Sequence, residues 1–217
     1  MTKKLLSLVL FIVVFAAARI PGMLSSDFAN FNPAYALLFC GGVYLSRGTA
    51  WWLPLSAMLI TDIGLNFYYV AQGFAVWEWP MLRYQVFNYV AWAAIILLGQ
   101  RFKPKHSAMS LLGGGILGAL LFYLITNTAA WLFNPFNNPE YTKTVWGWLR
   151  ALIFGTGGWP ETWQFFRNTL LSGGLFTGIF VAAMKFSTAE SAEEKKEARS
   201  DDEPADEPQP EEAKAEA

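Results

Sequence analysis

The sequence is poor in the residues from which most catalytic and metal sites are built. Its 217 residues include one cysteine, Cys40, and one histidine, His106. A single cysteine excludes an intramolecular disulfide framework and any multi-cysteine metal site. His106 lies among Arg101, Lys103 and Lys105, a placement typical of a solvated basic loop. We therefore expect no metal and no cofactor.

Sequence motifs of common enzymes are also missing. There is no HExxH helix, no pair of inward carboxylates and no Ser/His arrangement. The glycine run 113–115 lacks the Lys-Ser/Thr that completes a phosphate-binding loop, and it lies within an apolar stretch. We predict that the chain is not an enzyme and binds no nucleic acid.

Charge is scarce and unevenly placed. Charged residues make up 15% of the chain, and hydrophobic residues make up 54%, above the roughly 45–50% of a soluble domain. Residues 187–217 carry 12 acidic and 4 basic side chains and no aromatic one, whereas the rest has a net charge of +7. Such a segment cannot bury enough apolar surface to fold. We predict a transmembrane domain over residues 1–186 and a disordered, acidic, cytoplasmic tail over 187–217.

Six apolar runs are candidates for membrane spans, each of which needs about 20 residues. Backbone groups in lipid must bond within their own segment, so these runs are predicted to be helices. The fold class is therefore all-α integral membrane, with about six transmembrane helices. The runs are 5–20, 28 or 33 to 45, 50–69, 84–99, 108–132 and 165–186.

A Trp- and Pro-rich stretch, 134–163, separates the fifth and sixth runs. Aromatic rings favour the headgroup level of a bilayer. We predict an interfacial helix or lid over 145–154, with a re-entrant hairpin as the alternative. At the N-terminus, Lys3, Lys4, the first apolar run and the alanines 16–18 also fit a cleaved signal peptide. Retention of that helix and its cleavage are both left open.

Basic residues predict the orientation, because they favour cytoplasmic loops. With both termini in the cytoplasm, the inner side holds Lys3, Lys4, Arg47, Arg101, Lys103, Lys105 and Lys185. The outer side holds Arg19, Arg83, Lys143, Arg150 and Arg167. The predicted location is the bacterial cytoplasmic (inner) membrane, with several spans.

In this orientation the polar residues of the helices gather toward the outside, while the inward halves are apolar. Polar groups inside a membrane are costly, so each is a candidate functional residue. Asp62 is the only acid within a predicted span, and an arginine, Arg19 or Arg167, is its expected partner. The pattern predicts an outward-open pocket above a dry plug. The candidate substrate-binding residues are Arg19, Asn32, Asp62, Asn66, Asn127, Trp131, Arg167 and Asn168.

Each candidate also has a simpler structural explanation. Arginines can reach outer headgroups, and Asn32 before Pro33 is a natural helix cap. Gly113, Gly114, Gly115 and Gly118 permit close helix approach. That approach could be intramolecular or could serve another subunit.

Four segments carry a resemblance to a known family. They are Asn30-Phe-Asn-Pro-Ala-Tyr-Ala-Leu-Leu-Phe-Cys-Gly-Gly-Val-Tyr-Leu45, Leu59-Ile-Thr-Asp62, Thr126-Asn-Thr-Ala-Ala-Trp131 and Phe165-Phe-Arg-Asn-Thr-Leu-Leu171. They resemble an uncharacterised bacterial family of membrane transport proteins, itself similar to the substrate-binding (S) components of energy-coupling factor (ECF) transporters. S components often have Ala-x-x-x-Ala in the first helix, whereas residues 5–14 are bulky here.

The resemblance implies a six-helix domain that captures a small solute on the outer side. Its partners would be the lipid bilayer, the solute and a transmembrane coupling subunit with ATPases. Arginines suit an anion and Trp131 or Tyr68 a ring, so a vitamin-like or anionic nutrient is expected. The alternative is a non-transporting membrane scaffold or assembly protein that recruits a partner through its acidic tail.

Overall fold

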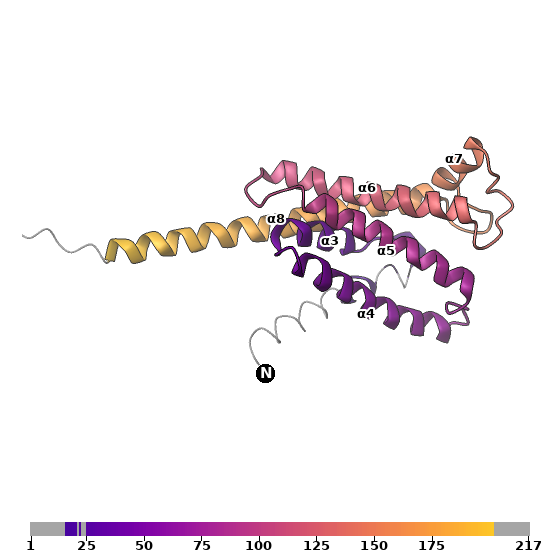
Figure 1. Cartoon of the computed structure of the whole chain (residues 1–217), viewed down its shortest axis with the longest axis horizontal. Helices are drawn as coiled ribbons and strands as arrows, with labels where there is room; N and C mark the ends of the chain where they lie inside the picture. The colour runs from indigo at the N-terminus through magenta and orange to yellow at the C-terminus, as the bar shows by residue number, and fades with distance from the viewer. Residues whose placement is uncertain (1–15, 21, 23–24, 202–217) are drawn as a thin grey trace, which may run out of the picture. The chain divides into compact units, whose positions relative to one another are not determined.

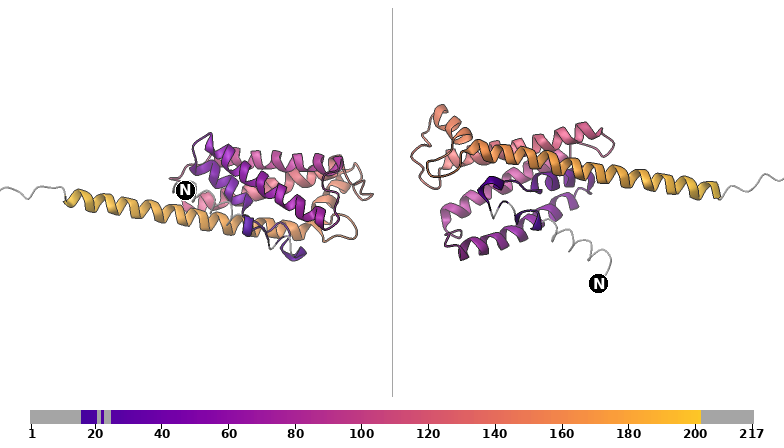
Figure 2. Two further views of the ribbon diagram at one scale, coloured as in Figure 1. Left: turned by 90° about the horizontal axis from the view of Figure 1, so that it is seen from below. Right: turned by 180° about the vertical axis from the view of Figure 1, so that it is seen from behind.

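The chain is helical throughout the part that the computed structural model describes, residues 16–20, 22 and 25–201, where no strand occurs. It divides into two compact units, Met1–Ala182 and Ala183–Ala217. The elements are η1 (Ser26–Phe28), α3 (Ala34–Tyr44), α4 (Thr49–Ala71), α5 (Trp79–Gly99), α6 (Ala108–Phe133), α7 (Val145–Ile153) and α8 (Thr162–Asp201), seen in Figures 1 and 2.

Four helices are long and apolar enough to cross a membrane: α4, α5, α6 and the Thr162–Thr188 part of α8. They coincide with four of the six runs predicted as spans, and they indicate an integral membrane protein. The second run forms α3, whose 11 residues extend only about 16 Å, half of the hydrocarbon thickness. The first run lies mostly outside the described residues, which include only its part 16–20, so the count of six remains a prediction.

Helix α3 forms the centre of the first unit. Every residue from Ala34 to Val43 is buried, and the helix contacts α4, α5 and α6 (Figures 1 and 2). It carries no charged residue, so nothing on its surface needs water. Apolar side chains of the surrounding helices, including Met58, Ile95 and Leu111, complete the core around it.

Glycines allow the backbones of α3 and α5 to come together. A Cβ atom on Gly42 would lie 2.5 Å from the carbonyl oxygen of Ile96, and one on Gly99 would lie 2.2 Å from that of Phe39. Both obstacles are backbone atoms, which cannot rotate away as a side chain can. The closest approach of the two helices therefore requires a glycine on each.

The glycines of α6 are used in the same way. A Cβ on Gly114 would meet the Phe39 ring of α3 at 2.4 Å, and one on Gly115 would meet the Thr177 side chain of α8 at 2.2 Å. Gly118 faces Ile95 of α5. Of the two expectations for this run, these three glycines fit intramolecular packing, whereas Gly113 has open space around it.

Short connections place the helix ends of the first unit in two groups. The turn after α3 and the loop between α5 and α6 carry Arg47, Arg101, Lys103 and Lys105, and we call this the basic end. At the opposite end α4 passes into α5, α6 ends, α7 lies and α8 begins (Figure 1). Asn134, with φ of +38°, ends α6 there in a left-handed conformation.

The tail differs from its prediction over residues 187–201, which the structure continues as helix α8 to Asp201. These residues are mainly Ala, Glu, Lys and Arg, all strong helix formers. Their polarity was read as disorder, but an extension of a preformed helix avoids the cost of nucleation. Residues 202–217 lie outside the described part of the chain.

We predict that Gly42→Ala destabilises the protein by about 1–3 kcal/mol, because the added methyl collides with the α5 backbone. The matched control is Gly113→Ala, also in a helix but with nothing within 4 Å of its Cβ position. It should be neutral or stabilising by up to about 1 kcal/mol. Thermal unfolding in detergent micelles measures both, and equal stabilities would contradict the close packing.

Candidate functional site

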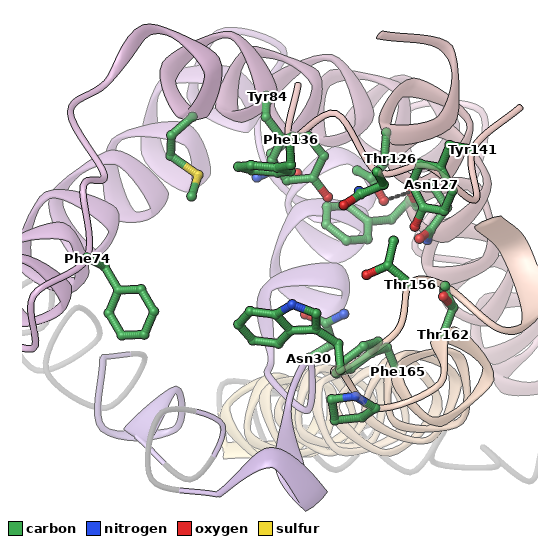
Figure 3. Close-up of a pocket in the computed structure, with 18 residues that line it drawn as sticks. Asn30, Phe74, Tyr84, Thr126, Asn127, Phe136, Tyr141, Thr156, Thr162 and Phe165 are labelled. Atoms are coloured by element: carbon green, nitrogen blue, oxygen red, sulfur yellow. Dashed lines mark hydrogen bonds between the residues drawn. The ribbon is translucent and has the colours of Figure 1, made fainter. Parts of the chain in front are cut away.

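A cavity of about 650 Å³ opens at the end of the bundle away from the basic loops (Figure 3). The first turns of α5 and α8, the last turns of α6 and the loops on either side of α7 form its walls. Its lining residues are Asn30, Phe74, Met81, Tyr84, Asn88, Phe122, Thr126, Asn127, Ala130, Phe136, Asn138, Tyr141, Gly155, Thr156, Trp159, Pro160, Thr162 and Phe165.

The lining combines rings with neutral hydrogen-bonding groups, and within the described part of the chain it has no ionisable acid or base other than tyrosine. Four side chains are amides, three are threonine hydroxyls and seven are aromatic. Asn127 donates from Nδ2 to its own helix, at the Tyr123 carbonyl oxygen 2.9 Å away. Thr126 likewise donates to the Phe122 carbonyl oxygen at 2.9 Å. Both side chains keep an oxygen that can accept a further hydrogen bond.

The floor of the cavity is apolar and closed. Phe122 lines the cavity, and its ring lies 5.0 Å from the Tyr35 ring of α3. Tyr35 is 1% exposed, and the residues beyond it toward the basic end, such as Phe39 and Ile95, are fully buried. The central helix thus closes the cavity from below.

Trp131 fixes the loop that follows α6. Its indole Nε1 donates to the Thr142 carbonyl oxygen at 2.7 Å, and the Lys143 ammonium lies 5.4 Å from its ring centroid. Lys143 also donates to the carbonyl oxygens of Trp131 and Leu132 at the end of α6, where the helix dipole favours a cation. Trp131 therefore holds a cavity wall in place and is not among the lining residues.

Helix α7 is held against α6 by two side chains. The Tyr123 hydroxyl donates to the Leu152 carbonyl oxygen, and the Trp148 indole donates to the Thr128 hydroxyl at 3.0 Å. The helix spans Val145–Ile153, close to the predicted 145–154. Val145 and Trp146 on it are exposed, and its location at a bilayer surface stays a prediction.

Glu140 joins the two loops that form the outer wall of the cavity. Its Oε1 accepts the Gly157 backbone N–H at 3.0 Å, so the segment after α6 is linked to the segment before α8. Hydrogen bonds from backbone N–H groups, first that of Gly157, hold the pKa of this carboxyl below its usual value. Burial raises the pKa of the neighbouring Tyr141 hydroxyl.

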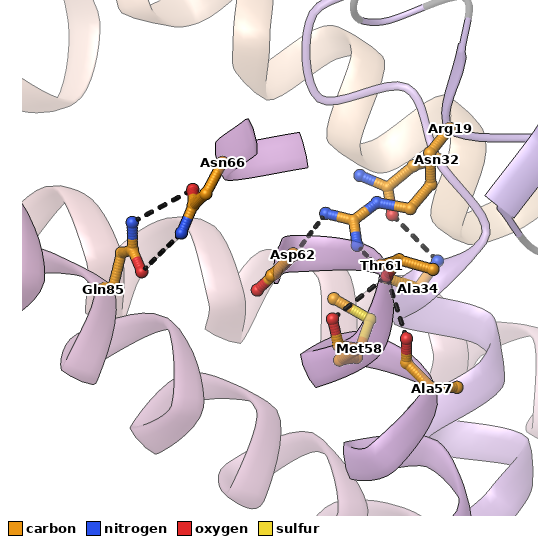
Figure 4. A network of polar contacts seen from close by, with 9 residues as sticks. All are labelled: Arg19, Asn32, Ala34, Ala57, Met58, Thr61, Asp62, Asn66 and Gln85. Atoms are coloured by element: carbon orange, nitrogen blue, oxygen red, sulfur yellow. Dashed lines mark hydrogen bonds and ion pairs between the residues drawn. The ribbon is translucent and has the colours of Figure 1, made fainter. Parts of the chain in front are cut away.

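Arg19 and Asp62 form an ion pair, one of the two partnerships expected for Asp62. Arg19 Nη2 lies 2.8 Å from Asp62 Oδ1, and the side chains are 14% and 22% exposed (Figure 4). Arg19 also donates to the Thr61 hydroxyl, which itself donates to the Ala57 and Met58 carbonyl oxygens. Neither charged residue lines the cavity.

The other polar candidates outside the cavity have partners within the protein. Asn32 precedes α3, and its Oδ1 accepts the Ala34 N–H at 2.9 Å, whereas the N-cap residue itself is Pro33 and not Asn32 as foreseen. Asn66 and Gln85 exchange amide hydrogen bonds of 3.4 and 3.5 Å between α4 and α5 (Figure 4).

Asn168 and Arg167 connect α8 to its surroundings. Asn168 is buried and donates to the carbonyl oxygens of Asp27 and Ala29, at 2.7 and 2.9 Å. Arg167 donates to Asn168 and lies 5.9 Å from the Trp163 ring centroid. Asn168 thus fixes the segment that precedes α3.

Of the eight candidate binding residues, Asn127 lines the cavity and the other seven do not. The sequence analysis missed most of the wall, because it searched the apolar runs for polar residues. Asn138, Tyr141, Thr156 and Trp159 lie in loops instead. The sequence feature that could have indicated these wall residues is the high content of Asn, Thr and aromatic residues in 134–163.

We predict that Arg19→Met and Asp62→Asn each destabilise the protein by about 2 kcal/mol, because each leaves a partly buried group without its partner. The double variant should lose less stability than the sum of the two single losses, since no unpaired charge remains. Thermal unfolding of the four proteins in micelles gives the coupling. Strictly additive losses would show that the two charges do not interact.

The Glu140 link should depend on pH. A carboxyl with a lowered pKa stabilises above its ordinary pKa and loses that effect as the pH falls through the lowered value. Hydrogen exchange of Gly157 should be slower in the natural protein than in Glu140→Ala at about pH 6. The ratio of the two rates should approach one toward about pH 3. A ratio that stays constant over this range would contradict the link.

Comparison with known proteins identifies the family of the chain. No curated protein and no solved structure matches it. The family model of DUF6580, described as a family of unknown function, matches residues 1–196. Since the match covers most of the sequence, the chain belongs to the DUF6580 family.

Proposed function

We propose that this protein captures a small solute from the outer side of a bacterial cytoplasmic membrane, as a membrane transport protein or its substrate-binding subunit. One observation carries the proposal: a cavity of about 650 Å³ with a polar and aromatic lining opens at one end of an apolar helix bundle. Its volume falls within the range of small-molecule sites, roughly 300–1,000 Å³. A purely structural bundle has no need of such a space.

The distribution of basic residues supports the direction of capture. Arg47, Arg101, Lys103 and Lys105 all lie in the short connections at the basic end, opposite the cavity. Short loops rich in Lys and Arg stay in the cytoplasm. The cavity then faces the exterior, and the closed apolar floor separates it from the cell interior.

A coupling partner is part of the proposal. Gly114 and Gly115 of α6 are packed against α3 and α8, and the glycine run lacks the Lys-Ser/Thr of a phosphate-binding loop. Transport against a gradient would need energy from elsewhere. The resemblance to ECF S components suggests a transmembrane coupling subunit with ATPases as that source.

Labelling of intact cells with a membrane-impermeant maleimide tests the direction of capture. Thr156→Cys places a thiol in the cavity lining, and Lys103→Cys places one at the basic end. We expect Thr156→Cys to react in intact cells and Lys103→Cys only after permeabilisation. The natural protein is the control, because its single cysteine, Cys40, is fully buried. The reverse pattern would refute outward capture.

The same variants test capture itself. A small-molecule fraction of a bacterial cell extract should slow the labelling of Thr156→Cys, because a bound solute shields the lining. The extract should not slow the labelling of Gln72→Cys, because Gln72 is an exposed residue beyond the lining at the same end. Equal rates with and without the extract at both positions would contradict solute capture.

A further inference from the structure

Resting on the proposed function, we infer that the captured solute is uncharged, carries an aromatic or similarly flat ring, and offers several hydrogen-bonding groups. The inference selects between the classes that the sequence left open, since it disfavours an anion. It depends on three features of the cavity: its electrostatics, its unengaged amides and its rings.

The electrostatics exclude charge recognition by the lining. Among the described residues that line the cavity there is no Asp, Glu, Lys, Arg or His. Removing an ion from water without a counter-charge costs several kcal/mol, so a site for an anion or cation almost always supplies one. The lining supplies none.

Three of the cations near the cavity, Arg19, Lys143 and Arg167, are engaged with other groups. Arg19 pairs with Asp62 at 2.8 Å, Lys143 donates to two carbonyl oxygens at the end of α6, and Arg167 donates to Asn168. Recruiting any of them for an anionic solute would break an existing contact. Their arrangement stabilises the protein around the cavity without charging its interior.

The amides of the lining have hydrogen-bonding groups that the described residues do not satisfy. The side chains of Asn30, Asn88 and Asn138 make no hydrogen bond with the described residues, and Asn127 uses only its Nδ2. In contrast, Asn32, Asn66, Asn134 and Asn168, outside the lining, bond within the protein, and Asn137, whose side chain makes no hydrogen bond with the described residues, is exposed. Amides that converge on one space without partners can donate to and accept from a neutral polar molecule.

Figure 3 shows that these groups come from opposite walls. Asn127, Thr126 and Tyr141 lie on one side of the space, and Asn30 and Phe165 lie across from them. A solute that satisfies both walls must therefore carry polar groups at more than one of its edges.

Rings make up the remainder of the lining. Tyr84, Phe122, Phe136, Trp159 and Phe165 are among the seven aromatic side chains around the space. Aromatic faces bind a flat ring by stacking or by edge contacts, each worth about 0.5–1.5 kcal/mol beyond burial. An extended aliphatic solute could be buried against the apolar part of the lining, but it has no ring to make stacking or edge contacts with the aromatic side chains.

Matched acid and amide probes test the solute class on the full-length protein in lipid nanodiscs. The probes are indole-3-acetamide with indole-3-acetate, benzamide with benzoate, and hexanamide with hexanoate. Within each aromatic pair the amide should bind at least about tenfold more tightly than the acid, a difference of about 1.4 kcal/mol. Both aromatic amides should exceed hexanamide. Equilibrium dialysis against empty nanodiscs gives the affinities.

Variants show whether binding occurs in the cavity. Asn127→Leu should weaken indole-3-acetamide about tenfold, because it removes a hydrogen-bonding oxygen of the lining. Gln72→Leu also removes an amide at this end, but one outside the lining, and should have no effect. Thermal unfolding of both variants excludes loss of the fold as the cause.

Three results would overturn the inference: an acid that binds as tightly as its amide, hexanamide equal to the aromatic amides, or Asn127→Leu without effect. Absence of binding by all six probes would overturn it as well. If the cell extract still protects Thr156→Cys in that case, the solute class is wrong and capture stands. If the extract gives no protection either, both proposals fail.

Discussion

The burial of α3 is the constraint on which the rest of this structure depends. An 11-residue helix cannot span a bilayer, so it must be enclosed by longer helices. Enclosure requires close packing: Gly42 and Gly99 allow near backbone contact between α3 and α5, and Gly114 of α6 makes room for the Phe39 ring of α3. Within a membrane, where lipid is as apolar as the side chains, such close packing is a main source of helix association.

The short length of α3 also explains why a cavity exists. The helix fills the bundle from the basic end to Tyr35, and beyond Tyr35 the longer helices continue without a central element. The cavity beyond Tyr35 is closed at its sides by loops that Trp131, Glu140 and Asn168 hold in place through hydrogen bonds. Polar residues near the cavity thus fall into two groups, those that hold its walls and those that face its interior.

The sequence predicted the helices well because hydrophobic length is a local property. Four spans and the helix at 145–154 were placed within a few residues of their positions in the structure. It predicted an arginine partner for Asp62 from charge alone. It could not separate Asn127, in the cavity, from Asn168, which holds a loop, because that distinction depends on which backbone carbonyls lie nearby. The loop residues of the wall were missed for the same reason.

The cavity ends at a closed, apolar floor within the first unit. A cysteine scan along α6 with a small, charged methanethiosulfonate reagent tests it directly, because α6 passes from cavity to core. Ala130→Cys and Asn127→Cys, at partly exposed lining positions, should react, and Ala119→Cys and Leu111→Cys should stay unmodified from either side of the membrane. Reaction at position 119 would show that water passes through the floor, and the account would be contradicted.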